Sequence, residues 1–272
     1  IGMTYFFLMN TIYKIYVIFS TLLTNQFIKM KKILLLLTLF ICGSLTSQIA
    51  VFHPVQVPGD QVETFEKIQT EYVQKIAQDA VDKGNLGAWA LLKAFNSTED
   101  DYNYLWVHFY QDVDQVVDKF SWWANSEEVL GIKPDILYGD INAKADRRYF
   151  YKMEMAIPNS AQGKWVILNF GNPDNVSQFL KDSEKIVMPH FEKMLNKSGL
   201  LGWGVATKIT PQGKNSQGGD YATAMTYDVY DNLKNVMLHM AGSAAIEGLP
   251  IEKISPANFS IRGIFSVVTG TE

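Results

Sequence analysis

Two stretches of the chain carry the same pattern and decide its fold: DQVETFEKIQTEYVQKIAQDAVDKGNLGAW at residues 60–89 and DNVSQFLKDSEKIVMPHFEKMLNKSGLLGW at residues 174–203. Aligned without a gap at an offset of 114, they share eight identical residues in a window of 30. Average composition would give about two by chance. The shared residues are Asp60, Val62, Phe65, Lys67, Val73, Lys83, Leu86 and Trp89, which match Asp174, Val176, Phe179, Lys181, Val187, Lys197, Leu200 and Trp203. The sequence therefore predicts an internal duplication.

The similarity continues beyond these stretches. It resumes at an offset of 120 and returns to 114 near the end of each copy, so the second copy has a longer loop at residues 210–220, rich in Gly, Gln, Asn and Ser. The further matches are Tyr110 with Tyr230, Val116 with Val236, and Arg148 with Arg262. Two copies predict two like supersecondary units rather than a solenoid, which needs at least about three repeats.

Each copy predicts the order strand, helix, strand, strand, helix, strand. Apolar residues recur at helical spacing from Phe65 to Ala80 and from Phe179 to Met194, and Asp60 and Asp174 are expected as N-caps of these helices. The second helices are expected at 113–124 and 232–241. The strands are expected at 49–57, from Trp89, at 102–110 and at 147–157, then at 164–170, from Trp203, at 221–230 and at 260–269.

This order is that of the ferredoxin-like split unit, an antiparallel sheet with both helices on one face. By element order, and by the junctions at 86–89 and 200–203, the chain resembles the dimeric α+β barrel superfamily in tandem form over nearly all of residues 48–272. The predicted fold class is α+β: two ferredoxin-like βαββαβ units, 48–159 and 160–272, closing on each other as a single-chain pseudo-dimeric barrel after an N-terminal signal peptide.

Residues 30–47 have the order of a secretory signal peptide. Two lysines, Lys31 and Lys32, precede an apolar run at 33–42 and a small polar stretch. This run is shorter than the roughly 20 residues that span a bilayer. We predict cleavage near Ser47, a secreted or periplasmic protein, and no stable membrane insertion of the mature chain.

Two features of this region have other interpretations. A lipoprotein attached at Cys42 is less favoured, because bulky Ile41 stands where the lipobox pattern has a small residue. Residues 1–29 are interpreted as an upstream or non-native extension, with Met30 as the true start, although a membrane anchor is the alternative. Lys14, in the middle of the apolar stretch, makes that anchor costly.

Composition excludes several classes of partner and site. The chain has 24 basic and 28 acidic residues, and four of the basic residues but none of the acidic ones lie in residues 1–47, so the remainder is acidic and a nucleic-acid partner is not expected. Cys42 is the only cysteine and there are four histidines, so no metal site is predicted. No phosphate-binding loop or dinucleotide fingerprint occurs, so no cofactor is predicted.

The resemblance implies that ligands enter the cleft between the helices and the sheet, while side chains pack the barrel interior. Six residues are predicted as ligand-binding candidates: His190, His108, Trp106, Trp203, Tyr230 and Arg262. His190 stands where the first copy has Ile76, on the apolar face of its helix, and a buried imidazole needs a hydrogen-bond partner. Both a ligand-binding role and a satisfied histidine at a helix end are open for it.

The other candidates have structural interpretations as well. Residues 102–110 alternate, so Trp106 and His108 share one strand face that could line a cleft for a flat ligand or simply pack. Arg262 repeats Arg148, which favours pairing with an acid on the adjacent helix. Trp89 and Trp203 are expected in the core, Trp122 and Trp123 at a cleft rim or contact patch, and His239, which matches Lys119, on the surface.

Three functional hypotheses follow. The first is a protein that holds a small apolar or aromatic molecule in one helix-to-sheet cleft, either as a binding protein or as a cofactor-independent enzyme. The second is a structural or protein-interaction module that uses exposed aromatic residues. The third is a haem-binding or monooxygenase-like barrel with His190 or His239 as the axial ligand, because haem-degrading and antibiotic-type monooxygenases are known among proteins of the fold that the chain resembles.

Overall fold

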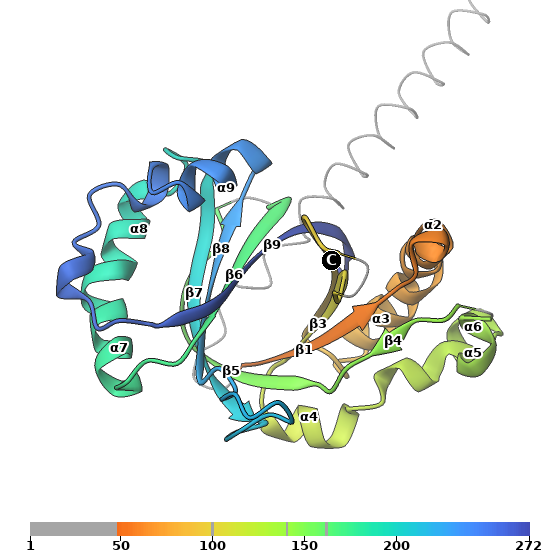
Figure 1. Ribbon diagram of the computed structural model, residues 1–272. Coiled ribbons are helices and arrows are strands. Elements are labelled where there is room, and N and C mark those ends of the chain that lie inside the picture. Colours follow the sequence, from red (N-terminus) through yellow and green to blue (C-terminus); the bar gives the residue numbers. More distant parts are fainter. Residues whose placement is uncertain (1–47, 99–100, 140, 161–162) are drawn as a thin grey trace, which may run out of the picture.

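A computed structural model describes residues 48–98, 101–139, 141–160 and 163–272. These residues form a closed barrel of eight antiparallel strands, with helices on its outside on two opposite sides (Figure 1). The predicted leader, the possible lipid site at Cys42 and the extension at 1–29 lie outside the described residues. Within the described residues, no helix is long and apolar enough to cross a membrane.

The barrel strands follow the predicted positions closely. They are β1 (Ile49–Gln56), β2 (Ala88–Ala94), β3 (Tyr104–Tyr110), β5 (Tyr149–Ile157), β6 (Trp165–Gly171), β7 (Leu200–Thr210), β8 (Ala224–Tyr230) and β9 (Phe259–Gly270). Their order around the barrel is β3-β2-β9-β6-β8-β7-β5-β1, closed by the pairing of β1 with β3. A two-residue strand, β4 (Lys144–Ala145), adds to β1 beyond β5.

The two halves of the chain have the same strand order. It is β5-β1-β3-β2 in the first half and β9-β6-β8-β7 in the second. The halves join through two seams, β2 with β9 and β5 with β7. Each seam pairs the second strand of one half with the last strand of the other, so the barrel is closed by hydrogen bonds between the halves.

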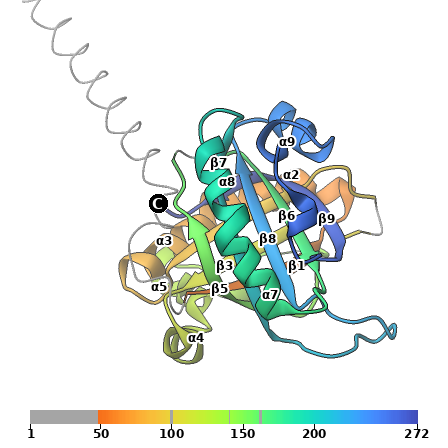
Figure 2. The same cartoon turned by 90° about the vertical axis from the view of Figure 1, so that its left-hand side faces the viewer.

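A long helix lies on the outer sheet face of each half. In the first half it runs through α2 (Val62–Ile68) and α3 (Gln74–Asp82), and in the second through α7 (Val176–Asp182) and α8 (Met188–Met194). In Figure 2, α7 and α8 lie in front of the sheet. Each is interrupted by one π-helical turn, at Gln69–Val73 and at Ser183–Val187. The two turns are again 114 residues apart. Apolar spacing predicted the helices but not the wide turns, because one extra residue in a turn barely changes the apolar pattern.

The helix starts differ from the expected N-caps. Asp60 lies inside a short 3₁₀ turn, Gly59–Gln61, and makes no capping hydrogen bond there. The second-half helix is capped by Asn175, not Asp174, because the Asn175 side chain accepts from the backbone N–H of Gln178. An aspartate one residue further from the helix cannot reach those free N–H groups.

The second helix of each half is short and is followed by further turns. These helices are α4 (Val113–Lys119) and α9 (Leu233–Met240), so the expected helix at 113–124 ends early. In the first half a 3₁₀ turn at Trp122–Asn125, α5 (Ser126–Leu130) and α6 (Pro134–Leu137) follow, and in the second half two 3₁₀ turns at Ala244–Ile246 and Ile251–Lys253. These segments lie between the second helix and the last strand of each half.

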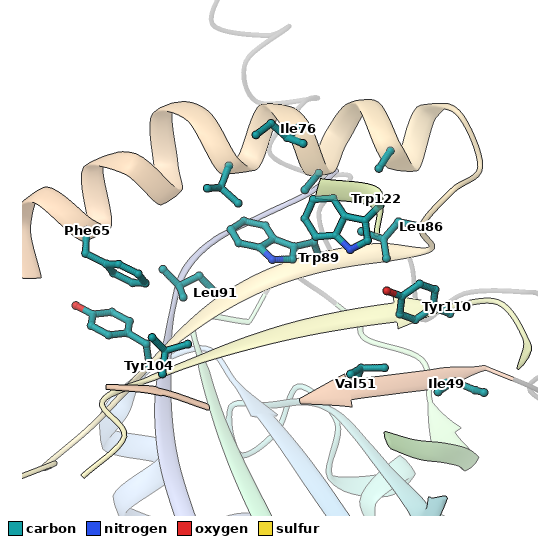
Figure 3. Packing of buried hydrophobic residues seen from close by; sticks show 14 of the residues in the cluster. Ile49, Val51, Phe65, Ile76, Leu86, Trp89, Leu91, Tyr104, Tyr110 and Trp122 are labelled. Carbon is teal, nitrogen blue, oxygen red and sulfur yellow. The ribbon is translucent and has the colours of Figure 1, made fainter. Parts of the chain in front are cut away.

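Period-two alternation along the strands divides the core into three parts. Trp89, Leu91 and Tyr104 point outward from the sheet of the first half. Ile76 and Phe65 of its long helix pack on them (Figure 3). Trp203 has the equivalent place in the second half. Both tryptophans are therefore in the core, as expected. The alternate residues of the strands point into the barrel, where the two halves share one core: its members include Phe52, Leu92, Val107, Leu168, Tyr227 and Val229.

We predict that neither half folds alone as a monomer. Separate expression of residues 48–159 and 160–272 would expose the seam edges of β2, β5, β7 and β9 together with the apolar inner sheet face, which favours aggregation. Light scattering and urea unfolding of each half should therefore show oligomers without cooperative monomeric unfolding. Two well-behaved monomers, each unfolding cooperatively, would contradict the shared core.

Candidate functional site

Each half of the molecule has one cleft between its helices and the outer sheet face, of about 380 Å³ in both cases. The first cleft lies in the first half, and its polar and aromatic lining is His53, Trp89, Trp106, His108, Trp122, Trp123, Asp135, Tyr138 and Arg148. The second cleft lies in the second half, and its polar lining is Asn169, Ser183, Thr226, Asp228, His239, Ser255 and Arg262. The two clefts thus share a position in the fold but differ in chemistry.

His108 lines the first cleft, and one of its two ring nitrogens has no partner within the described part of the chain. Its Nδ1 lies 3.1 Å from Nε1 of Trp122. An indole N–H can only donate, so Nδ1 accepts, and the proton of the neutral ring is on Nε2. Burial, reinforced by His53 and Arg148, lowers the pKa of His108 to about 3, so the ring is neutral at physiological pH. Its buried Nε2–H has no hydrogen-bond partner among the described residues.

Arg148 presents a second donor. Its guanidinium carbon lies 4.7 Å from the ring centroid of Phe120 and 4.9 Å from that of Trp123, so the cation sits against two aromatic faces. Its buried Nε–H has no hydrogen-bond partner among the described residues. Among those residues, the ion pairs all involve lysine, so the expected pairing of Arg148 with an acid is wrong.

The aromatic walls of the first cleft are fixed by a buried glutamine. Gln69, the first residue of the π-helical turn, accepts from Trp106 Nε1 at 2.8 Å through Oε1 and donates to the Tyr138 hydroxyl at 3.1 Å through Nε2. One side chain therefore orients a strand residue and a residue that follows α6. His53 completes this side, with its ring centroid 5.2 Å from that of Trp106. Burial, with a smaller effect of Arg148, lowers the pKa of His53 to about 4.

In the second cleft, by contrast, the polar groups bond to each other. Arg262 donates from Nε to Oδ1 of Asn169 at 2.8 Å. Asn169 donates in turn from Nδ2 to Asp228 at 2.9 Å and to Thr226 at 3.0 Å. Burial raises the pKa of Asp228, although His239, Asn169 and Arg262 oppose that shift. Ser183, at the start of the π-helical turn, is the exception, because its buried hydroxyl has no partner among the described residues.

His239 extends this network into the interior. Arg262 lies with Nη2 3.3 Å from His239 Nε2, and the Tyr230 hydroxyl lies 2.6 Å from His239 Nδ1. Since arginine can only donate, Nε2 accepts, and Nδ1–H donates to the tyrosine oxygen. His239 is 3% exposed, so its expected surface position is wrong. Its counterpart Lys119 is the last residue of α4, whereas α9 continues to Met240 and holds His239 against the sheet.

The structure distributes the six predicted site residues over three places. His108 and Trp106 line the first cleft, and Trp203 and Arg262 line the second. Tyr230 is buried behind the second cleft, where it bonds to His239. His190 lines neither cleft, because its Nε2 bonds to the carbonyl oxygen of Ala245 at 2.8 Å. That is the satisfied histidine of the alternative interpretation, so a ligand-binding role for His190 stays a prediction without structural support.

His53, Asp135, Tyr138 and Arg148 line the first cleft, and Gln69 orients two of its aromatic residues, but none of these was among the six predicted candidates. Arg148 carried a signal in the sequence, since it matches Arg262 at an offset of 114. Gln69 and Tyr138 carried none, because a glutamine in a helix and a tyrosine in a loop are ordinary surface residues until the fold brings them together. Among the described residues, no group of three or more His, Cys, Asp or Glu side chains is placed to hold a metal ion.

Comparison with solved structures shows the fold of the chain. A protein from Fusobacterium nucleatum, provisionally assigned as a monooxygenase, has a TM-score of 0.52 at 13% identity, covering 84% of this chain and 95% of its own. A mutant chlorite dismutase from Candidatus Nitrospira defluvii, in complex with cyanide, has a TM-score of 0.50 at 8% identity, covering 85% and 92%. A haem-binding protein from Thermus thermophilus has a TM-score of 0.46 at 7% identity, covering 81% and 91%.

The first two of these similarities confirm the resemblance to dimeric α+β barrel proteins. No protein-family profile matches the sequence, and no curated protein matches it. At such low identity a shared fold fixes the architecture but not the function.

We predict that the buried neutral histidines make the protein less stable as the pH falls. The pKa of His108 is about 3 in the folded protein and about 6.5 when unfolded, so the unfolded state binds more protons between these values. The contribution of neutral His108 to the free energy of unfolding is intact above pH 6.5. It declines as the pH falls, by up to about 1.4 kcal/mol per pH unit.

Urea unfolding at pH 7, 6, 5 and 4 measures this slope. His108→Gln keeps an acceptor for Trp122 but cannot titrate. The slope of its unfolding free energy against pH should therefore be smaller than that of the unmodified protein, by an amount that corresponds to at most one bound proton. Equal slopes for the two proteins would show that His108 is not held neutral by burial.

Proposed function

We propose that the protein binds a small, flat aromatic molecule that carries an anionic or carbonyl oxygen, in the first cleft. The observation that supports this most directly is the pair of unpaired buried donors, His108 Nε2–H and Arg148 Nε–H. A buried polar group without a partner costs roughly 1 to 3 kcal/mol, and nearly all such groups in proteins are paired. Because both groups only donate, the ligand that satisfies them has an acceptor: a carboxylate, a phenolate or a quinone-type carbonyl.

The walls of the first cleft favour an aromatic body for this ligand. Trp106, Trp122 and Trp123 offer ring faces and edges, and Gln69 holds Trp106 in place before any ligand binds. The same residues argue against a protein-interaction module built on exposed tryptophans, since Trp122 is 4% exposed and Trp123 is half-buried in the cleft.

The histidines of this cleft support binding rather than base catalysis. The pKa of His108 is about 3 and that of His53 is about 4, so both rings are neutral at pH 7 and both are weak bases. In this proposal His108 donates a hydrogen bond to the ligand from its neutral ring. Arg148 supplies the positive charge.

Haem is the alternative ligand that the fold invites, and three of the four histidines do not fit it. An axial imidazole needs a free lone pair on its outer nitrogen. The outer nitrogen of His108 carries the proton, that of His239 accepts from Arg262, and His190 lies outside both clefts. His53, the remaining histidine, lines the first cleft and bonds the Asp146 backbone, so a haem ligated by His53 is the alternative to our proposal that this cleft works without haem. Titration of haem into the protein tests this, because a Soret shift typical of histidine ligation would favour the alternative.

We also propose that the barrel arose by tandem duplication of a ferredoxin-like unit, with its boundary near residue 159, between β5 and β6. Three features support this origin: the eight identities at an offset of 114, the same strand order in both halves, and the π-helical turns at the same offset.

Arg148 gives the sharpest test of the proposed ligand class. We predict that 2-naphthoate quenches tryptophan fluorescence of the protein in a saturable way, and that the uncharged 2-naphthamide binds much more weakly. Arg148→Met removes the cation but keeps an apolar stem, and should weaken naphthoate binding about 10- to 150-fold, which corresponds to a charge-assisted hydrogen bond of roughly 1.5 to 3 kcal/mol.

Arg147→Met is the matched control, because Arg147 is the neighbouring residue with the same charge, is exposed, and lines neither cleft. It should bind naphthoate as the unmodified protein does. Equal losses in the two variants would mean that net charge alone attracts the probe, and tight binding by Arg148→Met would contradict the proposal.

Secretion or a periplasmic location is a further proposal, supported by the Lys31 and Lys32 pair and the apolar run at 33–42. Cleavage near Ser47 would leave β1 whole, since this strand begins at Ile49. We predict that N-terminal sequencing of protein recovered from the periplasm or medium begins near Gln48. An intact residue 30, or membrane association that resists salt washing, would contradict it.

A further inference from the structure

The barrel interior contains a cavity of about 120 Å³. It shares the lining residue Trp89 with the first cleft and no lining residue with the second. Strands of both halves line it with side chains that are almost all apolar, including Ala88, Ala90, Val107, Leu168, Tyr227 and Val229. The resemblance implied an interior packed with side chains, and at this place that expectation is wrong.

The cavity has a cause that can be read from the two copies. In the second half, Gly204 on β7 pairs with Tyr227 on β8. A Cβ atom at Gly204 would collide with the ring of Tyr227, so the ring fills the space above a bare backbone. The equivalent pair in the first half is Ala90 on β2 with Val107 on β3, at offsets of 114 and 120. There a valine stands where the other copy has a tyrosine.

The surrounding strands prevent this space from closing. β2 is hydrogen-bonded to β3 on one side and to β9 on the other, and β3 is bonded to β1 and β2. The radius of a closed barrel is set by its strand number and stagger, so one smaller side chain cannot draw the walls together. The side chains around the cavity therefore lack contact partners on one side, which lowers stability unless something fills the space.

The chemistry of the walls selects the occupant. An ordered buried water needs about two to four polar partners, and an apolar cavity of about 150 Å³ in another protein stays dry and binds benzene or xenon. An ion would lose its hydration without gaining a partner. We propose that the interior cavity is a binding site for a neutral apolar molecule no larger than benzene, the class that includes dioxygen and short hydrocarbons.

Methyl NMR of the whole protein with dissolved xenon, and separately with benzene, tests this. Saturable shifts are expected for the methyl groups of Ala90, Val107 and Val229 around the cavity. None is expected for Val117, which is 72% exposed on α4, or for Ile76 in the first cleft. Shifts at Ile76 alone would place the probe in the first cleft and overturn the proposal.

Two variants fill the cavity in different ways. Ala90→Leu adds bulk from β2, and the double variant Ala90→Gly with Val107→Tyr copies the pair of the second half. Each should abolish the saturable shift at Val229 while keeping or raising the melting temperature. Val117→Leu, which adds one methylene on the exposed face of α4, should bind the probes as the unmodified protein does.

The results decide the proposal without reference to the first cleft. The absence of saturable shifts at Ala90 and Val107 in the unmodified protein would overturn it. Shifts at Val229 that persist in either folded cavity-filling variant would overturn it as well. Naphthoate binding in the first cleft should be unaffected by both variants, so a failure here is distinguishable from a failure of the proposed function.

Discussion

The closure of the barrel is the constraint on which the rest of the structure depends. A four-stranded sheet with helices on one face leaves its other apolar face bare, and here each half covers the bare face of the other. The seams β2–β9 and β5–β7 then leave no open edge between the halves. Because the inner faces pack mainly against each other, the two clefts form on the outer faces, under the helices.

Closure also fixes the backbone of both halves while their side chains differ. Trp89 and Trp203 occupy equivalent places in the two outer cores, and the π-helical turns fall at the same offset. On this common frame, the second half places Asp228 where the first has His108, and Asn169 with Thr226 complete its hydrogen bonds. The first half has no such completion at His108 Nε2 or Arg148 Nε. The two clefts are therefore of similar volume but differ in their walls and in which buried polar groups are paired.

The same divergence on a fixed frame explains the barrel interior. Tyr227 pairs with Gly204 in the second half, and Val107 pairs with Ala90 at the equivalent place in the first half. The tyrosine ring fills the space above the glycine, whereas the smaller valine does not fill the equivalent space. In an open sheet or a helical bundle the neighbouring elements could move together. In a closed barrel the hydrogen-bond ladder holds them apart, so the volume that the smaller pair lacks remains in the interior.

The sequence by itself determined the element order, the strand positions and the two cores under the helices. Those features follow from local periodicity and from the repeat at Phe65 and Phe179, which needs no knowledge of distant contacts. It also placed Trp106 and His108 on one strand face, because alternation along a strand is local.

Only the tertiary structure decided which polar atoms are satisfied. The hydrogen bonds that satisfy them join residues that are far apart in the chain or are brought together by irregular turns. They are the bonds of His190 to Ala245, of His239 to Tyr230 and Arg262, and of His108 to Trp122. A hydrogen bond depends on distances of a few tenths of an ångström, and periodicity carries no such information. For that reason the resemblance implied where a cleft would lie, and the fold decided that, among the described residues, His108 and Arg148 of the first cleft keep unpaired donors while Arg262 of the second is bonded.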